Sequence, residues 1–455
     1  MDTLTQSIAR FACGFAATAV PAASLAVARY AFTDLLGVML AGGTQPVARI
    51  LTQATAASAH QGRCTVLLDP DVRRSAADAA LVNGTAAHAL DFDDVQFNAH
   101  PSTVLVPAIL AEAERGGKSG LDMEMAYVLG YEVWGELHSR ESHPYHDKGW
   151  HPTAMLGPLA ATAAVAFLRG LDVEQTRAAL SLSASFVGGV VGNFGSMAKP
   201  MHAGRAAACA ITAVDWAQVG LTAGADAIGA RDGLLAALSP QGKARLDGAT
   251  RLGERWFSLT TPLMVKKYPV CFSTHRPLDG ILEIARAHGL KADDVADMHI
   301  SVRGTQARVL RFDRPRNALE GKFSMQFAAA CAMLRGGVGL MDLDDGFVAS
   351  EPVQSFFDKV RFTHLPLLGD GTPPLADRVV ITTTDGRVLD SGDLMIATPH
   401  TRLKEKFIDC CAAGGYPHGQ ALFARLASLE QLGDARELAM AGRTPAAAPA
   451  LALAA

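Results

Sequence analysis

Apolar residues recur at spacings of three and four along most of the first 262 residues of this 455-residue chain. Between Pro21 and Ala41 they stand at positions 25, 27, 31, 32, 35, 36, 39 and 40, and the pair Gly42–Gly43 follows. This spacing forms one face of an amphipathic helix, and glycine commonly follows the last residue of a helix. The same pattern predicts helices at residues 75–90, 123–138, 152–168, 173–186 and 205–219, the last after a glycine-rich break at residues 188–204.

The periodicity changes near residue 263, and nothing before that point alternates strongly. Met298, Ile300 and Val302 alternate with polar residues, as successive side chains of a strand do. Residues 378–390 have the pattern of two strands joined at Asp385–Gly386, a strong hairpin signal. Helical patterns also occur at residues 274–288, 323–334, 403–411 and 420–432, before an Ala- and Pro-rich end at residues 444–455. We therefore predict a mainly α fold with an α+β insertion: a helical domain of residues 1–262 completed by residues 398–455, and an α+β domain of residues 263–397.

Composition narrows the class of protein. Hydrophobic residues make up 49% and charged residues 19%, which suits a large buried core. The formal net charge is −4 with no basic run, so nucleic acid is not an expected partner. The seven cysteines are scattered without a CxxC pair, as in a reducing compartment. The most apolar window, residues 154–167, is shorter than the roughly 20 residues of a membrane span. We expect a cytoplasmic protein that does not bind membranes.

One acidic stretch stands out within otherwise small and apolar residues. Asp91, Asp93 and Asp94 fall within four positions, with His88 before them and His100 after them. No Lys or Arg lies between residues 74 and 115. Buried carboxylates in such surroundings must find distant cations, take up protons or bind a metal. Three solvated aspartates at a helix end remain the ordinary alternative.

Three later stretches add cations and imidazoles. His151 precedes a predicted helix, Lys199 and His202 flank Pro200, and Lys266, Lys267 and His275 lie where the pattern changes. Each stretch alone is compatible with a helix cap or a surface charge. Together they match proton removal from carbon next to a carboxylate, which needs a cationic clamp, a base of near-neutral pKa and donors to the anion that forms. Motifs for nucleophilic serine, phosphate or dinucleotide chemistry are absent from the sequence.

These stretches resemble the MmgE/PrpD family. The matching segments are NGTAAHALDFDD with HPS at His100, GWHPTAMLGPLAA around His151, NFGSMAKPMHAGRAA around Lys199, KKYPVCFSTH ending at His275, and GKFSMQFA at Lys322. The resemblance implies a helical domain with an α+β lid, a homodimer, no metal or organic cofactor, and an active site between domain and lid. By matching position it implies catalytic roles for Asp91, His100, His151 and His275, and substrate binding by Lys199, His202, Lys266 and Lys267.

The sequence departs from the family pattern after DFDD, where Val95 replaces an expected Thr. Gln96 or Asn98 would then supply the missing donor, and Tyr145 and His146 could contribute a second acid–base group. The function predicted is a lyase of dehydratase or decarboxylase type, acting on a small di- or tricarboxylate such as 2-methylcitrate or cis-aconitate. An epimerase of a substituted succinate such as iminodisuccinate is the main alternative. A metal-dependent hydrolase and a non-catalytic carboxylate-binding paralogue are the others.

Overall fold

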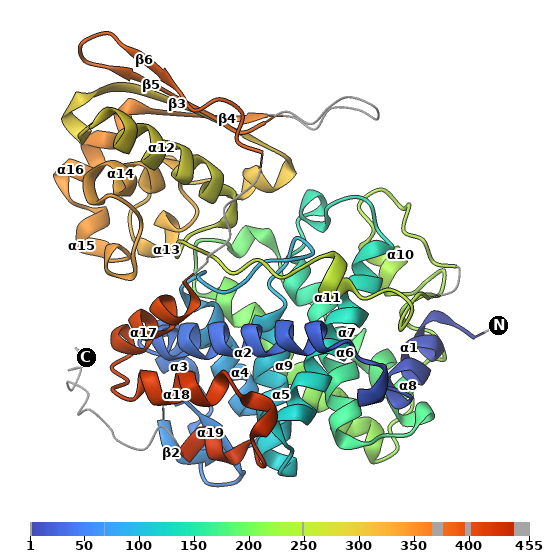
Figure 1. Cartoon of the computed structure of the whole chain (residues 1–455). Coiled ribbons are helices and arrows are strands. Elements are labelled where there is room, and N and C mark those ends of the chain that lie inside the picture. The colour runs from blue at the N-terminus through green and yellow to red at the C-terminus, as the bar shows by residue number, and fades with distance from the viewer. Residues whose placement is uncertain (1, 68, 248–249, 366–375, 396–401, 441–455) are drawn as a thin grey trace.

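The structure is a computed structural model that describes residues 2–440 except 68, 248–249, 366–375 and 396–401. Its described residues form two large hydrophobic cores, one in a large helical part and one in a smaller α+β part (Figure 1), and a small third cluster around Leu90 and Phe92. Residues from both chain ends share the larger core, which includes Leu4 and Ile8 as well as Phe407 and Leu426. The helices of this part are α1 Leu4–Cys13, α2 Ala22–Gly42, α3 Pro46–Ala54, α4 Ala76–Ala89, α5 Ser102–Gly116, α6 Gly120–Ser139, α7 Pro152–Arg169, α8 Val173–Ser183, α9 Ala198–Gln218, α10 Leu234–Leu238, α11 Phe257–Thr260, α17 Leu403–Ala413, α18 Gly419–Leu426 and α19 Arg436–Met440.

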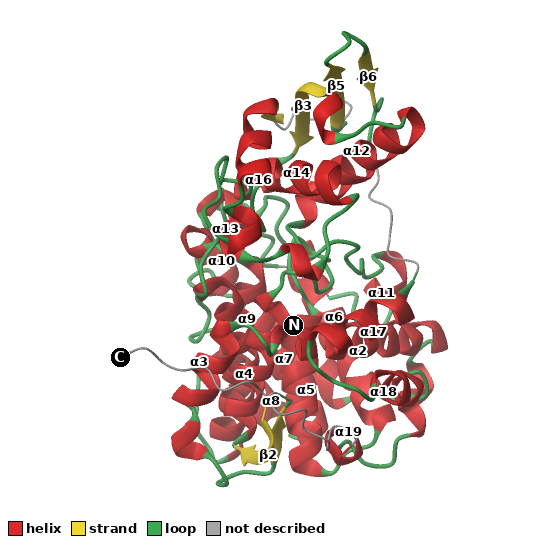
Figure 2. Cartoon of the chain, turned by 90° about the vertical axis from the view of Figure 1, so that its left-hand side faces the viewer, coloured by secondary structure: helices red, strands yellow, loops and turns green. Residues whose placement is uncertain are grey.

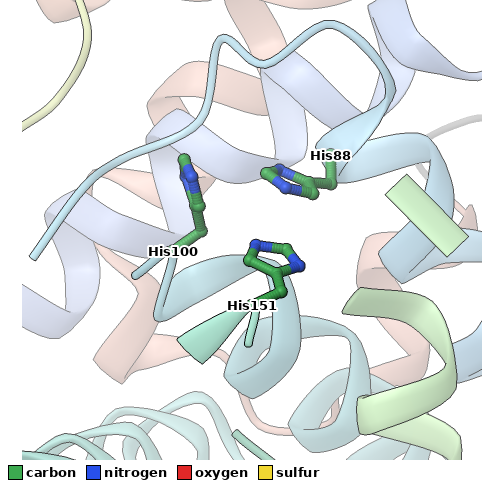
Figure 3. Close-up of side chains that lie close together, drawn as sticks. All are labelled: His88, His100 and His151. Carbon is green, nitrogen blue, oxygen red and sulfur yellow. The ribbon is translucent and has the colours of Figure 1, made fainter. Parts of the chain in front are cut away.

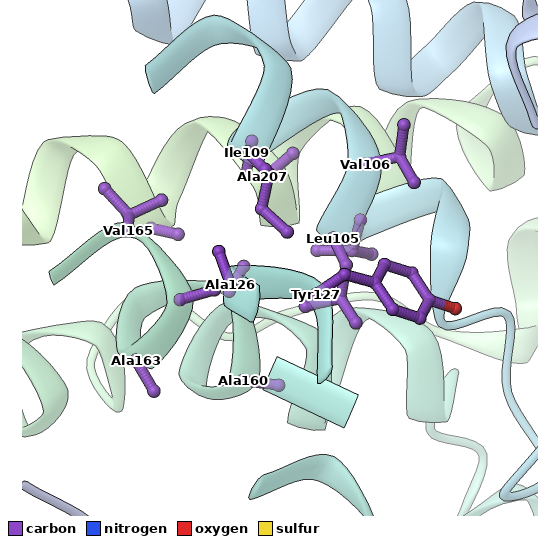
Figure 4. Packing of buried hydrophobic residues seen from close by; sticks show 14 of the residues in the cluster. Leu105, Val106, Ile109, Ala126, Tyr127, Ala160, Ala163, Val165 and Ala207 are labelled. Atoms are coloured by element: carbon purple, nitrogen blue, oxygen red, sulfur yellow. The ribbon is translucent and has the colours of Figure 1, made fainter. Parts of the chain in front are cut away.

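Small residues let the central helices of the helical part pack closely. Leu105, Ala126, Ala160 and Ala207 come from α5, α6, α7 and α9 and are all buried in the same core (Figure 4). Alanine lets helix axes approach, and each buried larger side chain between them contributes about 1.5–3 kcal/mol to folding. The resulting bundle is the rigid support on which the loops near the α+β part are mounted.

Helices α4 and α9 cross at glycine. A Cβ atom on Gly204 would lie 2.1 Å from the carbonyl oxygen of Leu81, and one on Gly84 would lie 2.8 Å from the Cα of Gly204. The glycine-rich break predicted at residues 188–204 was therefore placed too far along the chain: α9 begins at Ala198, not Arg205. Pro200 falls in its first turn, where the missing N–H costs no hydrogen bond.

The α+β part spans about residues 268–395 and contains a four-stranded sheet in the order β4-β3-β5-β6. Strand β3 pairs parallel with β4 and antiparallel with β5. Met298, Ile300 and Val302 are fully buried, which confirms the alternation read from the sequence. Helices α12 and α14 lie on one side of the sheet (Figure 2). The elements are α12 His275–His288, β3 Val295–Arg303, α13 Ala318–Gly321, α14 Met325–Arg335, α15 Asp345–Val348, α16 Glu351–Phe356, β4 Val360–Leu365, β5 Arg378–Thr383 and β6 Val388–Asp390.

The fold class predicted from the sequence, mainly α with a smaller α+β part, is confirmed. A short hairpin of β1 Cys64–Val66 and β2 Asp69–Arg74 was not anticipated, because its residues do not alternate. The domain boundaries at residues 262 and 397 stay a prediction. Residues 444–455, which we expected to be frayed, lie outside the described residues.

Helices α2 and α7 are long and apolar enough to cross a membrane by length and composition. However, 67% and 89% of their most apolar windows are buried inside the helical part. Core helices of large domains pass the same test, so this is weak evidence for a membrane span.

Candidate active site

The acidic stretch forms the loop between α4 and α5, at the side of the helical part that faces the α+β part. Asp91, Phe97 and Asn98 have positive φ angles of 51°, 55° and 56°. Such angles are uncommon outside glycine and tend to cluster at functional sites. The loop borders a cavity of about 50 Å³. The lining residues that come before the α+β part in the chain are Asp91, Val95, Asn98, His100, His146, His151, Phe194 and Lys199, and those from the α+β part are Cys271, Phe272, Ser273, Val309 and Phe323.

Asp91 is paired with two lysines that are distant in sequence. Its side chain accepts hydrogen bonds from Lys199 and, at 2.8 Å, from Lys266. Burial alone would raise the pKa of Asp91, but the two ammonium groups outweigh it and hold the pKa far below its usual range. Asp91 is therefore charged at neutral pH, and both lysines are fixed beside the cavity.

Three buried lysines also donate to backbone carbonyls at the C-terminal end of α4 and just beyond it. Lys322 donates to Ala89 O at 2.6 Å, Lys266 to Asp91 O at 2.7 Å, and Lys406 to Phe92 O at 2.7 Å. The carbonyls at a helix C-terminus carry partial negative charge and attract cations. Lys406 belongs to α17, Lys322 follows α13, and Lys266 lies in the segment that leads into the α+β part. The three lysines therefore tie the loop to three separate regions of the chain.

Asp93 is shared by two histidines. Its Oδ1 lies 2.9 Å from Nδ1 of His88, and its Oδ2 lies 2.6 Å from Nδ1 of His100. Burial opposes a charge on Asp93, but the two imidazoles hold its pKa well below the usual range. A carboxylate behind Nδ1 fixes the ring orientation and leaves Nε2 to act, as in catalytic dyads and metal sites.

Asp94 behaves differently from its two neighbours. Burial raises its pKa to about 8, and the nearby carboxylates of Asp93 and Asp34 add to the shift. Its Oδ1 accepts the N–H of Ser102 at 3.3 Å. Asp94 is therefore mostly protonated at neutral pH. Burial of the three aspartates is thus compensated in three ways: Asp91 pairs with distant cations, Asp93 accepts from imidazoles, and Asp94 holds a proton.

Three imidazoles converge beside the cavity: His88 from α4, His100 from the residue before Pro101, and His151 at the N-terminus of α7 (Figure 3). The centroids of the His88 and His100 rings are 4.4 Å apart, and those of the His88 and His151 rings 5.8 Å. Burial and the charge of Lys199 lower the pKa of all three, to about 3 for His88. All three histidines are therefore neutral at pH 7 in this structure.

The cavity wall also places aromatic rings next to Lys199. The Lys199 ammonium lies over the adjoining rings of Phe194 and Phe323, 5.2 and 5.0 Å from their centroids. Contacts of this kind stabilise a cation by about 0.5–2 kcal/mol each. Aromatic walls also exclude water, which strengthens the attraction between Lys199 and an anionic group in the cavity.

The structure brings together most, but not all, of the residues predicted for the site. His100, His151, His146, Asp91 and Lys199 line the cavity. His202 is one step behind it, with its Nδ1 3.2 Å from Nδ1 of His151. Lys266 reaches the site only through Asp91. His275 is buried against Tyr268 and Phe272, and burial lowers its pKa to about 3.

Besides His202 and Lys266, three further predicted substrate contacts do not line the cavity. Lys267 pairs with Asp279 at 2.6 Å and lines a different cavity, because its side chain leaves the backbone on the side opposite to that of Lys266. Gln96 donates to Pro262 O at 2.5 Å, and Asn98 lies in the wall in its place. Tyr145 is buried, and the cavity wall includes its neighbour His146 instead.

Sequence reasoning missed His88, Asp93 and Lys322 as parts of the site. His88 stands three residues before Asp91, a spacing that puts both near one helix face, but nothing in that spacing shows a shared partner. The bridging role of Asp93 depends on the loop conformation after α4. Lys322 lies 233 residues from Ala89, and only its place in a resembling segment singled it out.

The fold and the site together define a two-part, mainly helical protein with a buried, cation-bearing cavity between its parts. The MmgE/PrpD N-terminal domain model matches residues 6–247, and the MmgE/PrpD C-terminal domain model matches residues 268–415. The chain belongs to the MmgE/PrpD family.

Curated relatives carry one activity in their names. The chain is 28% identical to human cis-aconitate decarboxylase over 344 residues, which cover 73% of this chain and 71% of the relative. It is 28% identical to the mouse protein of that name, over 78% of this chain and 74% of the relative. A cis-aconitate decarboxylase-like protein oryM of Aspergillus oryzae is 24% identical, over 82% of each chain. Family and relatives point to an enzyme.

Proposed function

We propose that this protein is a decarboxylase of a small unsaturated tricarboxylate that works without a cofactor, with cis-aconitate as the first candidate substrate. The observation that carries the proposal is the dyad of His100 and Asp93 at the cavity, beside Lys199. The dyad can deliver a proton to carbon, and the lysine can hold a carboxylate. The names of the relatives select decarboxylation among the reactions that such a site could perform.

The negative charge of the bound substrate would convert His100 into a proton donor. A neutral imidazole is a poor proton donor, and the pKa of His100 is lowered by burial and by Lys199 while Asp93 opposes the shift. A tricarboxylate brings negative charge close to the ring, which favours the imidazolium. His100 would therefore take up a proton as substrate binds, supported by Asp93 behind it. His151 has no carboxylate on its Nδ1, which faces His202, so we assign the proton to His100.

The reaction then balances with one proton. The bond between the methylene carbon and its carboxylate breaks and releases carbon dioxide, and that electron pair forms a new double bond to the central carbon. The old π pair takes the proton of His100 at the vinylic carbon, which is α to a carboxylate. The product is 2-methylidenesuccinate, and His100 is left neutral. Lys199 would orient a carboxylate, and the apolar walls would favour loss of the charged group as neutral carbon dioxide.

Substrate entry requires the cavity to widen. A volume of about 50 Å³ has room for a few water molecules, not for a six-carbon tricarboxylate. Phe272, Val309 and Phe323 form the wall contributed by the α+β part. An outward shift of this wall would admit substrate, and its return would exclude water during the reaction.

Proton NMR of the purified chain with cis-aconitate in D2O tests the proposal. We expect two vinylidene proton signals, release of carbon dioxide, and one deuterium in the new methylene group. His299→Ala, which changes an imidazole on the sheet of the α+β part, is the matched control and should keep full activity. His100→Asn should abolish the signals.

Other substrates in the same experiment distinguish the alternatives. Deuterium entering iminodisuccinate at an α carbon with the skeleton intact would replace the proposal by an epimerase. A vinylic product from 2-methylcitrate, with no carbon dioxide from any substrate, would replace it by a dehydratase. Activity that appears only after metal is added would favour a metal-dependent hydrolase. Ligand binding without turnover of any substrate would indicate a carboxylate-binding paralogue.

A further inference from the structure

The three imidazoles beside the cavity have an arrangement that acid–base chemistry alone does not require. One ring nitrogen each of His88, His100 and His151 lies within 4.8 Å of those of the other two. Tetrahedral zinc sites hold ligand nitrogens at about 2.0–2.1 Å from the ion, and therefore roughly 3.4 Å from one another. To hold an ion, the three rings would have to move until each nitrogen–nitrogen distance is shorter by up to about 1.4 Å.

Two of these rings are already oriented as metal ligands usually are. Asp93 engages Nδ1 of both His88 and His100, so the Nε2 atoms carry the free lone pairs. A carboxylate behind each ligating histidine is the common supporting arrangement of zinc sites. Asp91 is less available as a ligand, because its oxygens are engaged by Lys199 and Lys266.

Unpartnered nitrogen atoms give a second, independent observation. Nε2 of His88 and Nε2 of His151 are buried, and neither has a hydrogen-bond partner among the described residues. Buried polar atoms in folded proteins almost always have a partner, and an exception calls for a ligand, an ion or water. The planes of these two rings are nearly parallel, with an angle of 16° between them, and His151 is part of the cavity wall.

We propose that His88, His100 and His151 bind one divalent transition-metal ion of the zinc type, and that the bound ion inhibits the enzyme. Neutral imidazole is the form that ligates metals. Three histidine ligands leave a fourth position open toward the cavity for chloride, hydroxide or a carboxylate. The nearby Lys199 ammonium repels a dication, so the fourth ligand should be an anion. The ion would occupy the lone pair of His100 that must accept the catalytic proton.

Metal binding and inhibition can be tested separately, since only the inhibition rests on the proposed function. The full chain is stripped with EDTA, desalted, and titrated with Zn²⁺ by calorimetry in the absence of any substrate. We expect one ion per chain, and a visible spectrum of four-coordinate geometry when Co²⁺ replaces Zn²⁺. Both His88→Gln and His151→Asn should weaken binding at least tenfold.

The controls remove other possible zinc ligands. His299→Ala lacks an imidazole on the α+β sheet, and Cys13→Ser lacks an exposed thiol; both should bind Zn²⁺ as the natural chain does. Absence of a stoichiometric site, an octahedral Co²⁺ spectrum, or equal affinity in a folded His88 or His151 variant would overturn metal binding. Zn²⁺ that binds at the site without slowing turnover of an active enzyme would overturn the inhibition alone.

Discussion

Two clusters of charged groups in this protein each contain buried carboxylates paired with cations or imidazoles, but they differ in the bonding capacity that they leave unused. The first cluster lies near the C-terminal ends of α5, α7 and α9. Glu112 accepts a hydrogen bond from Arg169 Nε at 2.6 Å and forms an ion pair with Arg115, and both arginines form ion pairs with Asp215. Burial raises the pKa of Glu112 to about 7. Both of its oxygens are engaged, and none of the four residues lines the site cavity.

In the cluster around Asp91 and Asp93, both carboxylates also have hydrogen-bond partners on each oxygen, but the imidazoles keep unused ring nitrogens. His88 and His151 each keep a ring nitrogen without a hydrogen-bond partner within the described part of the chain, and His100 lies in the cavity wall. A shifted pKa is therefore common to a structural ion pair and to a candidate site. What separates them is unused bonding capacity that faces a cavity. Substitutions in the two clusters should accordingly affect different properties.

The largest expected effect is that of His100→Asn on catalysis. Loss of the proton donor should lower kcat on cis-aconitate by about 10³-fold, within the range for removal of a general acid. Thermal unfolding should change by only a few degrees, because the amide can keep a hydrogen bond to Asp93. A kcat within tenfold of the natural value would exclude His100 as the donor.

Lys199→Met should have the next largest effect. The clamp for a carboxylate is lost while Lys266 still neutralises Asp91, so KM should rise and kcat/KM should fall by roughly 10–100-fold, as expected for a hydrogen bond to a charged group. Steady-state kinetics measures this. Lys267→Met is the matched control, since this ammonium pairs with Asp279 outside the site cavity; equal losses in both variants would contradict the assignment.

Arg169→Met, in the cluster around Glu112, should lower stability and leave catalysis unchanged. The free energy of unfolding should fall by about 2 kcal/mol, below the roughly 3–5 kcal/mol for breaking a fully buried pair, because Arg115 still contacts Glu112. The folded enzyme should keep its kcat. Urea unfolding and kinetics on the same sample measure both values, and a loss of kcat beyond twofold would remove the distinction between the clusters.

The last expected effect is on the pH dependence of stability, and it is small at each single pH step. Asp94 has a pKa near 8 when folded and about 4 when unfolded, so the folded state holds one more proton between these values. Its stabilising contribution is complete below pH 4 and is lost as pH rises through 8, by about 1.4 kcal/mol per pH unit. Asp94→Asn mimics the protonated acid and should remove this slope from urea unfolding measured between pH 6 and pH 8. An unchanged slope would show that Asp94 is ionised.

The sequence was sufficient for the fold class and for five of the cavity-lining residues, Asp91, His100, His146, His151 and Lys199. Helix periodicity located α2 and α7 within a residue or two, and alternation located β3. The start of α9 was misplaced because a glycine that allows close helix crossing has the same letter as one that ends a helix. Only the neighbouring helix, with Leu81 and Gly84, distinguishes the two cases.

The bonding pattern of the site could not be read in the same way. That three aspartates would need cations, protons or a metal followed from burial and from the missing lysines around them. Which aspartate found which partner depends on the positive φ angle at Asp91 and on lysines 108 and 175 residues away. Between Lys266 and Lys267, adjacent in sequence, only the backbone direction decides which ammonium meets Asp91.

The most direct measurement is the proton uptake that accompanies binding of propane-1,2,3-tricarboxylate, a saturated tricarboxylate that cannot react. Calorimetry at pH 7.5 in buffers of different ionisation enthalpy gives the number of protons taken up. If His100 is neutral in the empty site and charged beneath a polyanion, uptake should approach one proton per chain and disappear in His100→Asn. Binding without proton uptake, or uptake that His100→Asn leaves unchanged, would contradict the assignment of His100 as a donor that the substrate itself charges.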